Sequence, residues 1–556
     1  MAKKTVGQLL KESGYVTEEQ IQVALEVKKI KNMLLGEILI ELSFVSPREI
    51  ALVVAKQSGK PFLDINEHPP SKEALKLFDR HVAKQLEMIP IENKPEKLVV
   101  ALADPFNINN IDILQRKAGK PLEIYVSDKE TILKSIEINY FLLEKPIDEE
   151  INKMVEKAMA SGLTSDLPQL LDLLINSAII NRATDIHISP EEMATHIFFR
   201  VDGLLRHHYA FPTEVHTAIT SRIKILSSMD IAEQRLPQDG AMRHTFFDED
   251  FDIRVSTIPT SCGEEIALRI LTKNMSLFDF ESLGFETETT TRIIKQLRKA
   301  HGILLVTGPT GAGKTTTLYA ALRRINSLQR KILTVEDPIE YKFPFIKQTQ
   351  LNMKAGYTFA RAMKAFLRQD PDVILLGEMR DEETSEMALR AAITGHLVLS
   401  TLHTNDAVTA IPRLMEMGIK DYMIASGVGG ILAQRLVRKT CQFCSEEASE
   451  NIQELIAKGI PEEMFIKYGY SPDGKITYQK GKGCELCKGT GYSGRGVISE
   501  LLDIDQEIGE LIVNRATPLT IFDKAVEKGM IPMLESGLIK IKNGTTTPEE
   551  VLRVAL

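Results

Sequence analysis

The strongest chemical signal in the sequence is a glycine-rich loop at residues 308–316. It reads Gly308, Pro309, Thr310, Gly311, Ala312, Gly313, Lys314, Thr315 and Thr316, and its first eight residues match G-x-x-x-x-G-K-[ST] at every fixed position. In such a loop backbone N–H groups turn toward phosphate oxygens, the lysine reaches the β- and γ-phosphates, and the next hydroxyl ligates Mg²⁺. An apolar run precedes the loop and a helical segment follows it, which disfavours a chance glycine-rich turn. Lys314 and Thr315 therefore predict a site that binds and hydrolyses ATP with Mg²⁺.

Two acidic residues stand at the ends of apolar runs downstream of the loop. Glu336 lies in ILTVEDPIEY, residues 332–341, where a carboxylate beside the phosphate loop can orient the attacking water. Glu378 ends the apolar run of DPDVILLGEMRD, residues 370–381, which resembles a Walker B strand with Glu where Asp is commoner. It would hold Mg²⁺ directly or through water. The alternatives are a solvated acidic turn for Glu336 and a plain core strand with a polar end for Glu378.

Histidines and arginines give weaker signals. His396 and His403 bound an apolar strand within residues 394–407, which suits a γ-phosphate sensor, although a lone histidine at a strand end is more often structural. P-loop motors often complete their site with an arginine from a neighbouring subunit. The candidates before the loop are Arg200, Arg243, Arg254 and Arg269. Their spacing alone favours surface arginines on strands.

Four of the five cysteines form two C-x-x-C pairs. The pairs are Cys441 with Cys444 and Cys484 with Cys487, and Cys262 stands alone. Two such pairs supply the tetrahedral set of four thiolates that Zn²⁺ prefers, and four protein ligands leave no open position for catalysis. A redox pair and a vacant remnant are the alternatives. The spacing therefore predicts a structural zinc site.

Composition places the chain among soluble globular proteins. It has 556 residues, 43% hydrophobic and 26% charged, with a net charge of -8. Three or four domains are expected at roughly 150 residues each, and the mild acidity argues against a dedicated nucleic-acid binder. No apolar run approaches the roughly 18 residues of a membrane span, and none follows the lysines near the start. We expect neither a span nor a secretory signal, and a cytoplasmic chain with at most peripheral membrane contact.

Continuous apolar runs position the predicted site. They cover residues 302–308, 331–337, 372–378 and 396–402, alternate with helical segments, and fit a parallel sheet buried on both faces. This pattern predicts an α/β nucleotide-binding core. Before it, a small α+β domain is predicted from a helix at 166–182, strands at 186–188, 196–203, 250–259 and 265–271, and a helix around 215–228.

The first 57 residues contain a duplication, in which Val6 and Gly7 match Leu35 and Gly36. Each copy has apolar residues at helical spacing and predicts a helix-turn-helix unit. Capping boxes pair Thr17 with Gln20 and Ser46 with Glu49. A duplicated helical bundle without a ligand is the alternative to a binding role. Residues 60–140 mix strands and helices, with a buried strand at 97–105, and a charged linker follows from 144.

Together these segments resemble the type II secretion and type IV pilus assembly ATPases. The resemblance covers nearly the whole chain, and its most specific motifs stand in that family's order: TDIHIS, FRVDG, MDIAEQRLPQDG, DIRVSTIP, GPTGAGKTTTLYA, VEDPIEY, FARAMKAFLRQDPDVILLGEMRD, TGHLVLSTLHTNDA and the paired C-x-x-C motifs. It implies a homohexameric ring under an inner-membrane platform protein, in which ATP hydrolysis rotates or lifts the platform and pilin-like subunits join a filament.

The resemblance also assigns roles to residues. It makes Glu336 the catalytic glutamate of an acidic box, His403 part of a histidine box at 394–407, and Arg254 and Arg269 the arginines that reach the nucleotide. The fold class it implies is α/β. An N-terminal regulatory or docking domain covers 1–143, with helical repeats at 1–57 and an α/β part at 60–143, and a linker follows at 144–165. A PAS-like domain covers 166–285, and a RecA-like ATPase domain covers 286–556, which includes a Cys₄ zinc subdomain at 441–496 and C-terminal helices.

Some family features are altered or missing. The related retraction ATPases generally lack the repeats and the four cysteines, so this chain looks like a pilus extension or secretion motor, and the two are left open. The repeats are similar to a domain that binds cyclic di-GMP, whose motif opens Arg-Leu-Gly. Here Thr5 and Leu34 replace both arginines, which removes a guanine-stacking and phosphate-pairing anchor and makes cyclic di-GMP a doubtful ligand. The usual QDGR reads QDGA and ends at Ala241, with Arg243 two places on.

Two other functions use the same core. A RecA-like nucleic-acid motor is disfavoured by the acidic net charge and the absence of a basic stripe. A scaffold that binds ATP without turnover is disfavoured because Lys314, Thr315, Glu336 and Glu378 are all intact.

Overall fold

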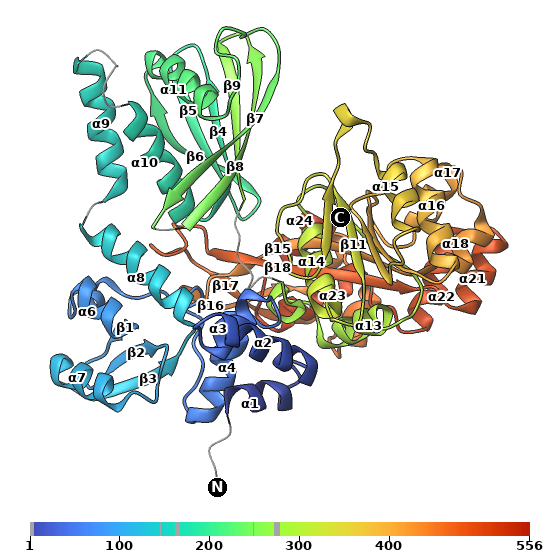
Figure 1. Cartoon of the computed structure of the whole chain (residues 1–556), viewed down its shortest axis with the longest axis horizontal. Helices are drawn as coiled ribbons and strands as arrows, with labels where there is room; N and C mark the ends of the chain where they lie inside the picture. Colours follow the sequence, from blue (N-terminus) through green and yellow to red (C-terminus); the bar gives the residue numbers. More distant parts are fainter. Residues whose placement is uncertain (1–4, 145, 162–166, 248, 272–277, 556) are drawn as a thin grey trace. The chain divides into compact units, whose positions relative to one another are not determined.

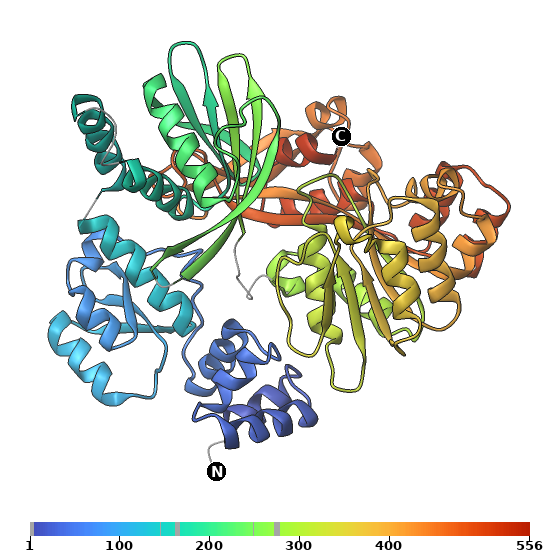
Figure 2. The same ribbon diagram turned by 45° about the horizontal axis from the view of Figure 1, so that its top comes forward.

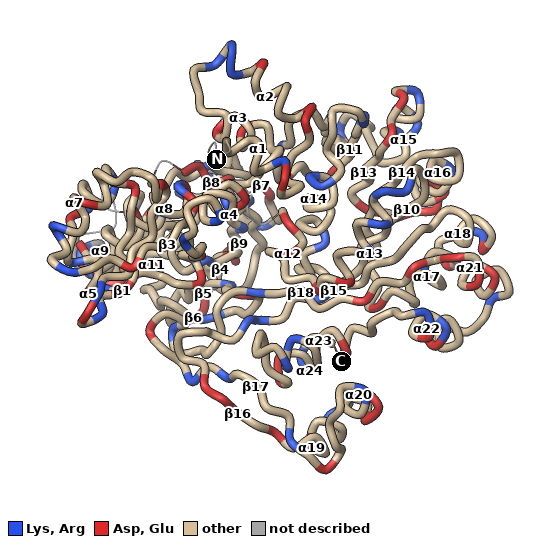
Figure 3. The backbone as a smooth tube through the Cα atoms, turned by 90° about the horizontal axis from the view of Figure 1, so that it is seen from below, with Lys and Arg blue, Asp and Glu red and all other residues tan. Residues whose placement is uncertain are grey.

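The computed structural model describes residues 5–144, 146–161, 167–247, 249–271 and 278–555 (Figure 1). The chain divides into two compact units, the first holding most residues before 272 and the second holding residues 18–33 and 41–44 together with those from 278 on. Among the described residues, no helix combines the length and the apolar character needed to cross a bilayer. Acidic and basic residues are interspersed along the backbone (Figure 3), as the near balance of charges in the sequence indicated.

The N-terminal repeat forms four helices, as predicted. They are α1 (Val6–Glu12), α2 (Glu18–Ile30), α3 (Leu35–Glu41) and α4 (Pro47–Ser58). The predicted capping box at Ser46 is present, because its side chain accepts the N–H of Glu49 and Glu49 bonds back to the Ser46 backbone. A Cβ on Gly36 would lie 3.3 Å from the side chain of Ile50, so this duplicated glycine allows close helix packing.

A small three-stranded sheet follows the repeat. Its order is β1-β2-β3, with β1 and β2 antiparallel and β2 and β3 parallel. The strands and their helices are β1 (Met88–Asn93), β2 (Leu98–Leu102), β3 (Leu122–Val126), α5 (Lys72–Leu75), α6 (Arg80–Gln85), α7 (Ile108–Ala118) and α8 (Lys129–Glu144). Every residue of β2 is buried, which confirms the buried strand predicted within 97–105.

The predicted linker is mostly helical. Helix α9 (Ile147–Ser161) occupies it, and residues 145 and 162–166 lie outside the described residues. Ile147 and Ile151 are buried with the core of the next sheet, and Asp148 accepts a hydrogen bond from the Tyr209 hydroxyl. The charged residues that suggested a linker occupy the rest of this amphipathic helix, and apolar residues four apart attach it to that core.

A six-stranded antiparallel sheet forms the α+β part of the first unit, in the order β6-β5-β4-β9-β8-β7. Its elements are β4 (Ala183–Pro190), β5 (Thr195–Val201), β6 (Leu204–Phe211), β7 (Gln238–Phe246), β8 (Glu249–Thr260), β9 (Gly263–Leu271), α10 (Leu167–Ile180) and α11 (Thr213–Leu226). The four predicted strands are confirmed. The two edge strands, β6 and β7, were missed. The residues of β7 are largely polar, and three consecutive polar residues, Arg206, His207 and His208, interrupt the apolar residues of β6.

A seven-stranded mixed sheet lies at the centre of the second unit (Figure 2). Its order is β12-β11-β13-β14-β10-β15-β18, and only the β15–β18 pair is antiparallel. The strands are β10 (Gly302–Thr307), β11 (Ile332–Glu336), β12 (Lys347–Gln350), β13 (Val373–Leu376), β14 (Leu397–Leu402), β15 (Val428–Thr440) and β18 (Tyr492–Asp503). The four predicted runs are four adjacent parallel strands of this sheet.

Both faces of this sheet are covered, which explains the continuous apolar runs. Ile303 and Leu305 join the core cluster on the side of α16, and Leu304 and Val306 join the one on the side of α14. The helices and remaining strands of the unit are α12 (Phe280–Leu283), α13 (Thr287–Leu297), α14 (Lys314–Ile325), η2 (Met353–Ala355), α15 (Phe359–Phe366), α16 (Glu382–Ile393), α17 (Ala410–Glu416), α18 (Asp421–Gly427), β16 (Ser445–Asn451), α19 (Ile452–Ala457), α20 (Glu462–Lys467), β17 (Lys475–Gly481), α21 (Gln506–Val513), α22 (Pro518–Glu527), α23 (Met533–Lys542) and α24 (Pro548–Ala555).

Candidate functional site

The glycine-rich loop joins the carboxyl end of β10 to the first residue of α14, the strand–loop–helix context that the motif requires. Gly308, Gly311 and Gly313 have φ values of 146°, 79° and 84°, a region that favours glycine. No side chain caps the N-terminus of α14 at Gly313, so the first N–H groups of the helix have no side-chain acceptor there. These groups and the helix dipole suit a phosphate.

Lys314 points back into the loop. Its ammonium group donates to the carbonyl oxygens of Gly308 at 2.8 Å and Pro309 at 3.1 Å. Burial lowers the pKa of Lys314, Glu378 acts to raise it, and Arg435 acts to lower it. A partly desolvated cation inside a ring of N–H donors fits a polyphosphate.

Gln434 on β15 fixes the loop from the adjacent strand. Its amide nitrogen donates to the carbonyl of Ala312 at 2.6 Å, and its amide oxygen accepts from the Thr317 hydroxyl at 2.8 Å. A Cβ on Gly308 would lie 2.6 Å from the Gln434 carbonyl oxygen, so only glycine fits where the loop crosses this strand. Gln434 is fully buried, and its bonds connect the loop, the helix and the sheet.

Glu336 ends β11 and is 4% exposed. One carboxylate oxygen accepts from the Tyr319 hydroxyl at 2.5 Å, and the other accepts from Thr334 at 2.6 Å and Gln348 at 3.1 Å. The alternative of a solvated acidic turn does not apply to Glu336 itself, because its carboxylate is buried and has three donors.

Glu378 follows β13 and faces two groups that can carry positive charge. It forms an ion pair with Arg380, and its other oxygen lies 3.7 Å from Nε2 of His403. Hydrogen bonds also join the strand ends here: the Thr401 hydroxyl donates to the Gly377 carbonyl at 2.8 Å. The structure thus brings together the predicted residues Glu378 and His403. His396 lies at the other end of β14 and bonds to the Ala391 carbonyl, which is a structural contact.

Three of the predicted arginines lie in one row across the six-stranded sheet. Arg254 pairs with Arg269, Arg269 with Asp185, and Asp185 with Arg200. Asp185 accepts from Nε of Arg269 at 2.9 Å and lies 3.8 Å from Nε of Arg200. The carboxylate of Asp185 therefore contacts two arginines. With three arginines and one aspartate, the row carries a net positive charge.

The altered QDGA motif lies at the end of this row. Ala241 is directly opposite Arg254, so the arginine usual at this position would extend the row. Arg243 pairs instead with Asp252, and its Nε lies 3.3 Å from that carboxylate. Arg243 therefore occupies a different position in the register.

The four cysteines converge as predicted. Their sulfur atoms all lie within 4.8 Å of one another, and the closest contacts measure 3.7, 3.8 and 3.9 Å. Tetrahedral Zn–S bonds of about 2.3 Å require sulfurs about 3.8 Å apart. Burial acts to raise the pKa of Cys487, but the N–H groups of Cys484 and Gly491 outweigh it and lower that pKa to about 6. Burial instead raises the pKa of Cys441 to about 12 and also raises that of Cys444. The sulfur positions and the donor type, rather than the thiol pKa values, are what fit zinc.

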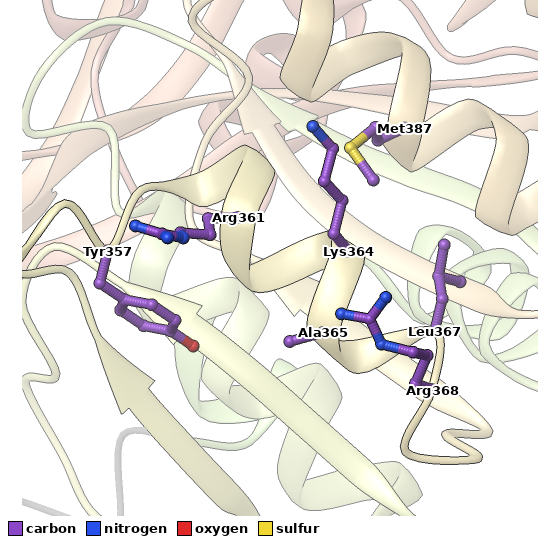
Figure 4. A pocket seen from close by; sticks show the side chains of 7 residues that line it. All are labelled: Tyr357, Arg361, Lys364, Ala365, Leu367, Arg368 and Met387. Atoms are coloured by element: carbon purple, nitrogen blue, oxygen red, sulfur yellow. The ribbon is translucent and has the colours of Figure 1, made fainter.

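A separate hollow of about 670 Å³ lies along α15 (Figure 4). Arg361, Lys364 and Arg368 make it cationic, with Tyr357 and Met387 completing its walls. None of the predicted site residues lines it, so the P-loop and the strand ends beside it remain the candidate site.

Comparisons with known proteins decide the family. The family model for "Type II/IV secretion system protein" matches residues 163–553. The chain is 35% identical to the Type IV pilus assembly ATPase PilB of Myxococcus xanthus, with 98% of each chain covered. It is 38% identical to the Type II secretion system protein E of Xanthomonas campestris pv. campestris, with 98% of this chain and 96% of that protein covered.

The chain belongs to the type II/IV secretion system ATPase family. The resemblance predicted from its motifs is confirmed. A 39% identity to PilB of Thermus thermophilus spans 93% of this chain and 58% of that longer protein. The X-ray structure of the Yersinia pseudotuberculosis ATPase DotB matches 70% of this chain and 93% of its own, with a TM-score of 0.51 and 21% identity, which shows a shared fold.

A second family model, the MshEN domain, matches residues 58–140 of this secretion ATPase. It covers the three-stranded sheet and its helices, whereas the repeat on which the sequence resemblance rested ends at residue 57. The α/β part of the N-terminal region is thus the part that the model recognises.

The sequence did not single out three residues of the P-loop surroundings in this secretion ATPase: Tyr319, Gln434 and Arg435. Tyr319 lies in the helical segment predicted after the loop, where nothing marked it as a partner of Glu336. Gln434 did leave a signal, because a lone amide inside the apolar run ILAQRLV of β15 must find partners when buried.

Proposed function

We propose that the chain hydrolyses ATP as a homohexamer and uses the energy to assemble a type IV pilus or a type II secretion pseudopilus at the inner membrane. The observation that carries this is the P-loop geometry, in which Lys314 lies inside a loop fixed by Gln434 and beside Glu378. Similarity over nearly the full length to proteins named as pilus assembly and secretion ATPases supports the use of that energy.

The proposed roles follow from chemistry and position. The loop from Gly308 to Thr316 holds the triphosphate, and Lys314 neutralises its β- and γ-oxygens. Thr315 and Glu378 would hold Mg²⁺, which bridges phosphate oxygens and offsets their charge. Glu336 orients the attacking water, and His403, beside Glu378, senses the γ-phosphate.

Arg254 and Arg269 complete the site of a neighbouring subunit. The row on β8, β9 and β4 supports this, because Arg254 and Arg269 lie side by side on neighbouring strands. The carboxylate of Asp185 contacts Arg269 and Arg200. Arginines supplied in trans stabilise charge on the transferring phosphoryl group. Assembly into a ring is then a requirement for turnover.

The architecture we propose has a RecA-like ATPase domain at 286–556, a PAS-like domain at 166–285 and an N-terminal regulatory or docking domain at 1–143. The seven-stranded and six-stranded sheets support the first two assignments. Zn²⁺ at Cys441, Cys444, Cys484 and Cys487 would stabilise the subdomain at 441–496. The partners are an inner-membrane platform protein and its associated assembly proteins, and the chain works in the cytoplasm at the membrane periphery.

Cyclic di-GMP is not part of this proposal. The position where an arginine would open the first repeat motif is Thr5, whose hydroxyl instead accepts the N–H of Gln8 as the N-cap of α1. Leu34 fills the second position, and neither side chain has the positive charge or the planar fork with which arginine pairs with a phosphate.

The test replaces Lys314 with Ala in the producing organism and in the purified full chain. We expect Mg²⁺-dependent ATPase activity to be lost, together with surface pili or secreted proteins. Loss of pili alone would assign pilus extension, and loss of secretion alone would assign type II secretion. Stable wild-type rings without turnover would indicate a scaffold, and stimulation by DNA or RNA would indicate a nucleic-acid motor.

A further inference from the structure

Arg435 lies at the carboxyl edge of the seven-stranded sheet, beside the P-loop. Thr307, the last residue of β10, pairs with Ala433 on β15, so Arg435 extends two residues past that pair on the loop side. A Cβ on Gly308 would lie 3.5 Å from Nη1 of Arg435. In parallel α/β sheets this edge is where ligands bind.

The guanidinium group is held in place by neutral oxygens. Nη2 donates to the Asn405 carbonyl at 2.8 Å and to its side-chain oxygen at 3.3 Å, and Nε donates to the Val554 carbonyl at 3.3 Å. Nη1 lies near the P-loop, and among the described residues its one hydrogen-bond contact is at 3.5 Å to the Gln434 carbonyl. A distance of 3.5 Å is at the limit of a hydrogen bond.

No carboxylate within the described ranges lies within ion-pair distance of this half-buried cation, and burial lowers its pKa although Glu500 and Asp406 act from farther away to raise it. Burying an unpaired charge is costly, and proteins that retain one usually pair it with a ligand or partner of opposite charge. Arg435 also acts electrostatically on Lys314, so the two positive charges share one site. The phosphates of a nucleoside triphosphate would place negative charge directly between these two cations.

We propose that Arg435 binds a phosphate group of the nucleotide held by the P-loop of its own subunit. This inference rests on the proposed nucleotide site and adds a second cation to it. Nη1 is the donor, because Nη2 and Nε are already held by Asn405 and Val554. The guanidinium group of Arg435 also bonds to the loop after β14, which carries His403, and to the last turn of helix α24. It therefore links both segments to the phosphate site.

The test measures the affinity of the full chain for ATP and ADP with Mg²⁺, by titration calorimetry or a fluorescent nucleotide. Four variants are compared with wild type: Arg435→Gln, Arg435→Lys, Lys314→Ala and Arg390→Gln. Arg390 is the matched control, since it is an exposed arginine of the same unit that pairs with Glu386. Thermal unfolding without nucleotide verifies that each variant folds.

We expect Arg435→Gln to weaken ATP binding about 10- to 100-fold, the value of a charged hydrogen bond. Arg435→Lys cannot bond to Asn405, Val554 and a phosphate at once, but it keeps the positive charge. Its affinity for ATP should therefore stay within about threefold of wild type. A loss in Arg435→Lys equal to that in Arg435→Gln would assign a purely structural role and overturn the inference, as would wild-type affinity in Arg435→Gln. If the P-loop does not bind the nucleotide, Lys314→Ala would bind ATP as tightly as wild type does. That result would distinguish an error in the proposed nucleotide site from an error in the role of Arg435.

Discussion

The hydroxyl of Tyr319 donates a 2.5 Å hydrogen bond to Oε2 of Glu336 and accepts the N–H of Glu340 at 3.1 Å. Tyr319 lies on α14, directly after the P-loop, and Glu336 ends β11. One buried hydroxyl thus ties the phosphate-binding helix to both ends of the acidic segment. Because this bond holds one oxygen of the proposed catalytic carboxylate while Thr334 and Gln348 hold the other, Tyr319 is a positioning residue for Glu336.

Replacing Tyr319 with Phe removes only that hydroxyl. We expect kcat for ATP to fall roughly tenfold, a part of what a positioned general base contributes, while KM stays within about twofold because Glu336 does not anchor the nucleotide. The free energy of unfolding should drop by about 1–3 kcal/mol, since a buried acceptor loses its donor. Steady-state kinetics and urea unfolding measure both quantities.

The control is Tyr357→Phe, which deletes a hydroxyl bonded to Thr349 in the same unit without contact to Glu336. It should leave kcat unchanged. Equal turnover by wild type and Tyr319→Phe would mean that the bond places no constraint on Glu336.

The four cysteines predict about one zinc per chain. Cys484→Ser removes one of four ligands, so we expect metal content to fall and the melting temperature to drop by several degrees, because structural zinc contributes directly to folding. Elemental analysis and thermal unfolding of the full chain provide the readouts. Cys262→Ser is the control, since that cysteine is exposed and lies far along the sequence from the cluster. A wild type without metal, equally stable after chelation, would exclude a zinc site.

Glu550 gives a pH prediction. Its side chain is fully buried, and burial acts to raise its pKa, but hydrogen bonds from Arg553 and Arg438 outweigh burial and lower the pKa to about 2. In the unfolded chain the group titrates near 4.5, so its stabilisation is complete above that pH and is lost as pH falls toward 2. The shift corresponds to about 3 kcal/mol at neutral pH.

Urea unfolding at pH 7, 5, 4 and 3 tests this with Glu550→Gln. The wild type should be more stable by about 3 kcal/mol at pH 7, and the gap should narrow below pH 4.5. Glu549→Gln is the matched control, because the neighbouring carboxyl is exposed and should show little difference at any pH. A gap that stays constant down to pH 3 would contradict the proposed titration of Glu550.

Much of the ATPase unit was predictable because its strands are buried on both faces. Continuous apolar runs such as residues 302–308 have the length of a strand and are shorter than a typical buried helix. The P-loop that follows β10 fixes the sheet edge where the site lies. The paired cysteines were predictable for a different reason, since four thiolates at C-x-x-C spacing have few uses other than a metal.

Features that depend on partners distant in sequence were not predictable. Gln434 and Arg435 act through Ala312 and Asn405, more than a hundred and about thirty residues away, and no local pattern records such pairs. Strand β7 was missed because its exposed face is polar, and helix α9 within the predicted linker was not foreseen because its few apolar residues look sparse among charges.

The row formed by Arg254 and Arg269 leads to a prediction about subunit exchange. If these arginines serve the nucleotide site of a neighbouring subunit, Arg254→Ala and Lys314→Ala each give inactive rings for different reasons. Mixing the two purified variants at ring-forming concentration should restore part of the Mg²⁺-dependent ATPase activity, because an intact P-loop can then face an intact arginine. We expect up to about a quarter of wild-type activity from random mixing, since one site in four combines an intact P-loop with an intact arginine.

The control is Arg243→Ala, mixed with Lys314→Ala in the same way. Arg243 pairs with Asp252 outside the row, so this variant should be active alone. Mixtures of Arg254→Ala and Lys314→Ala that stay inactive despite confirmed co-assembly would show that Arg254 serves its own subunit.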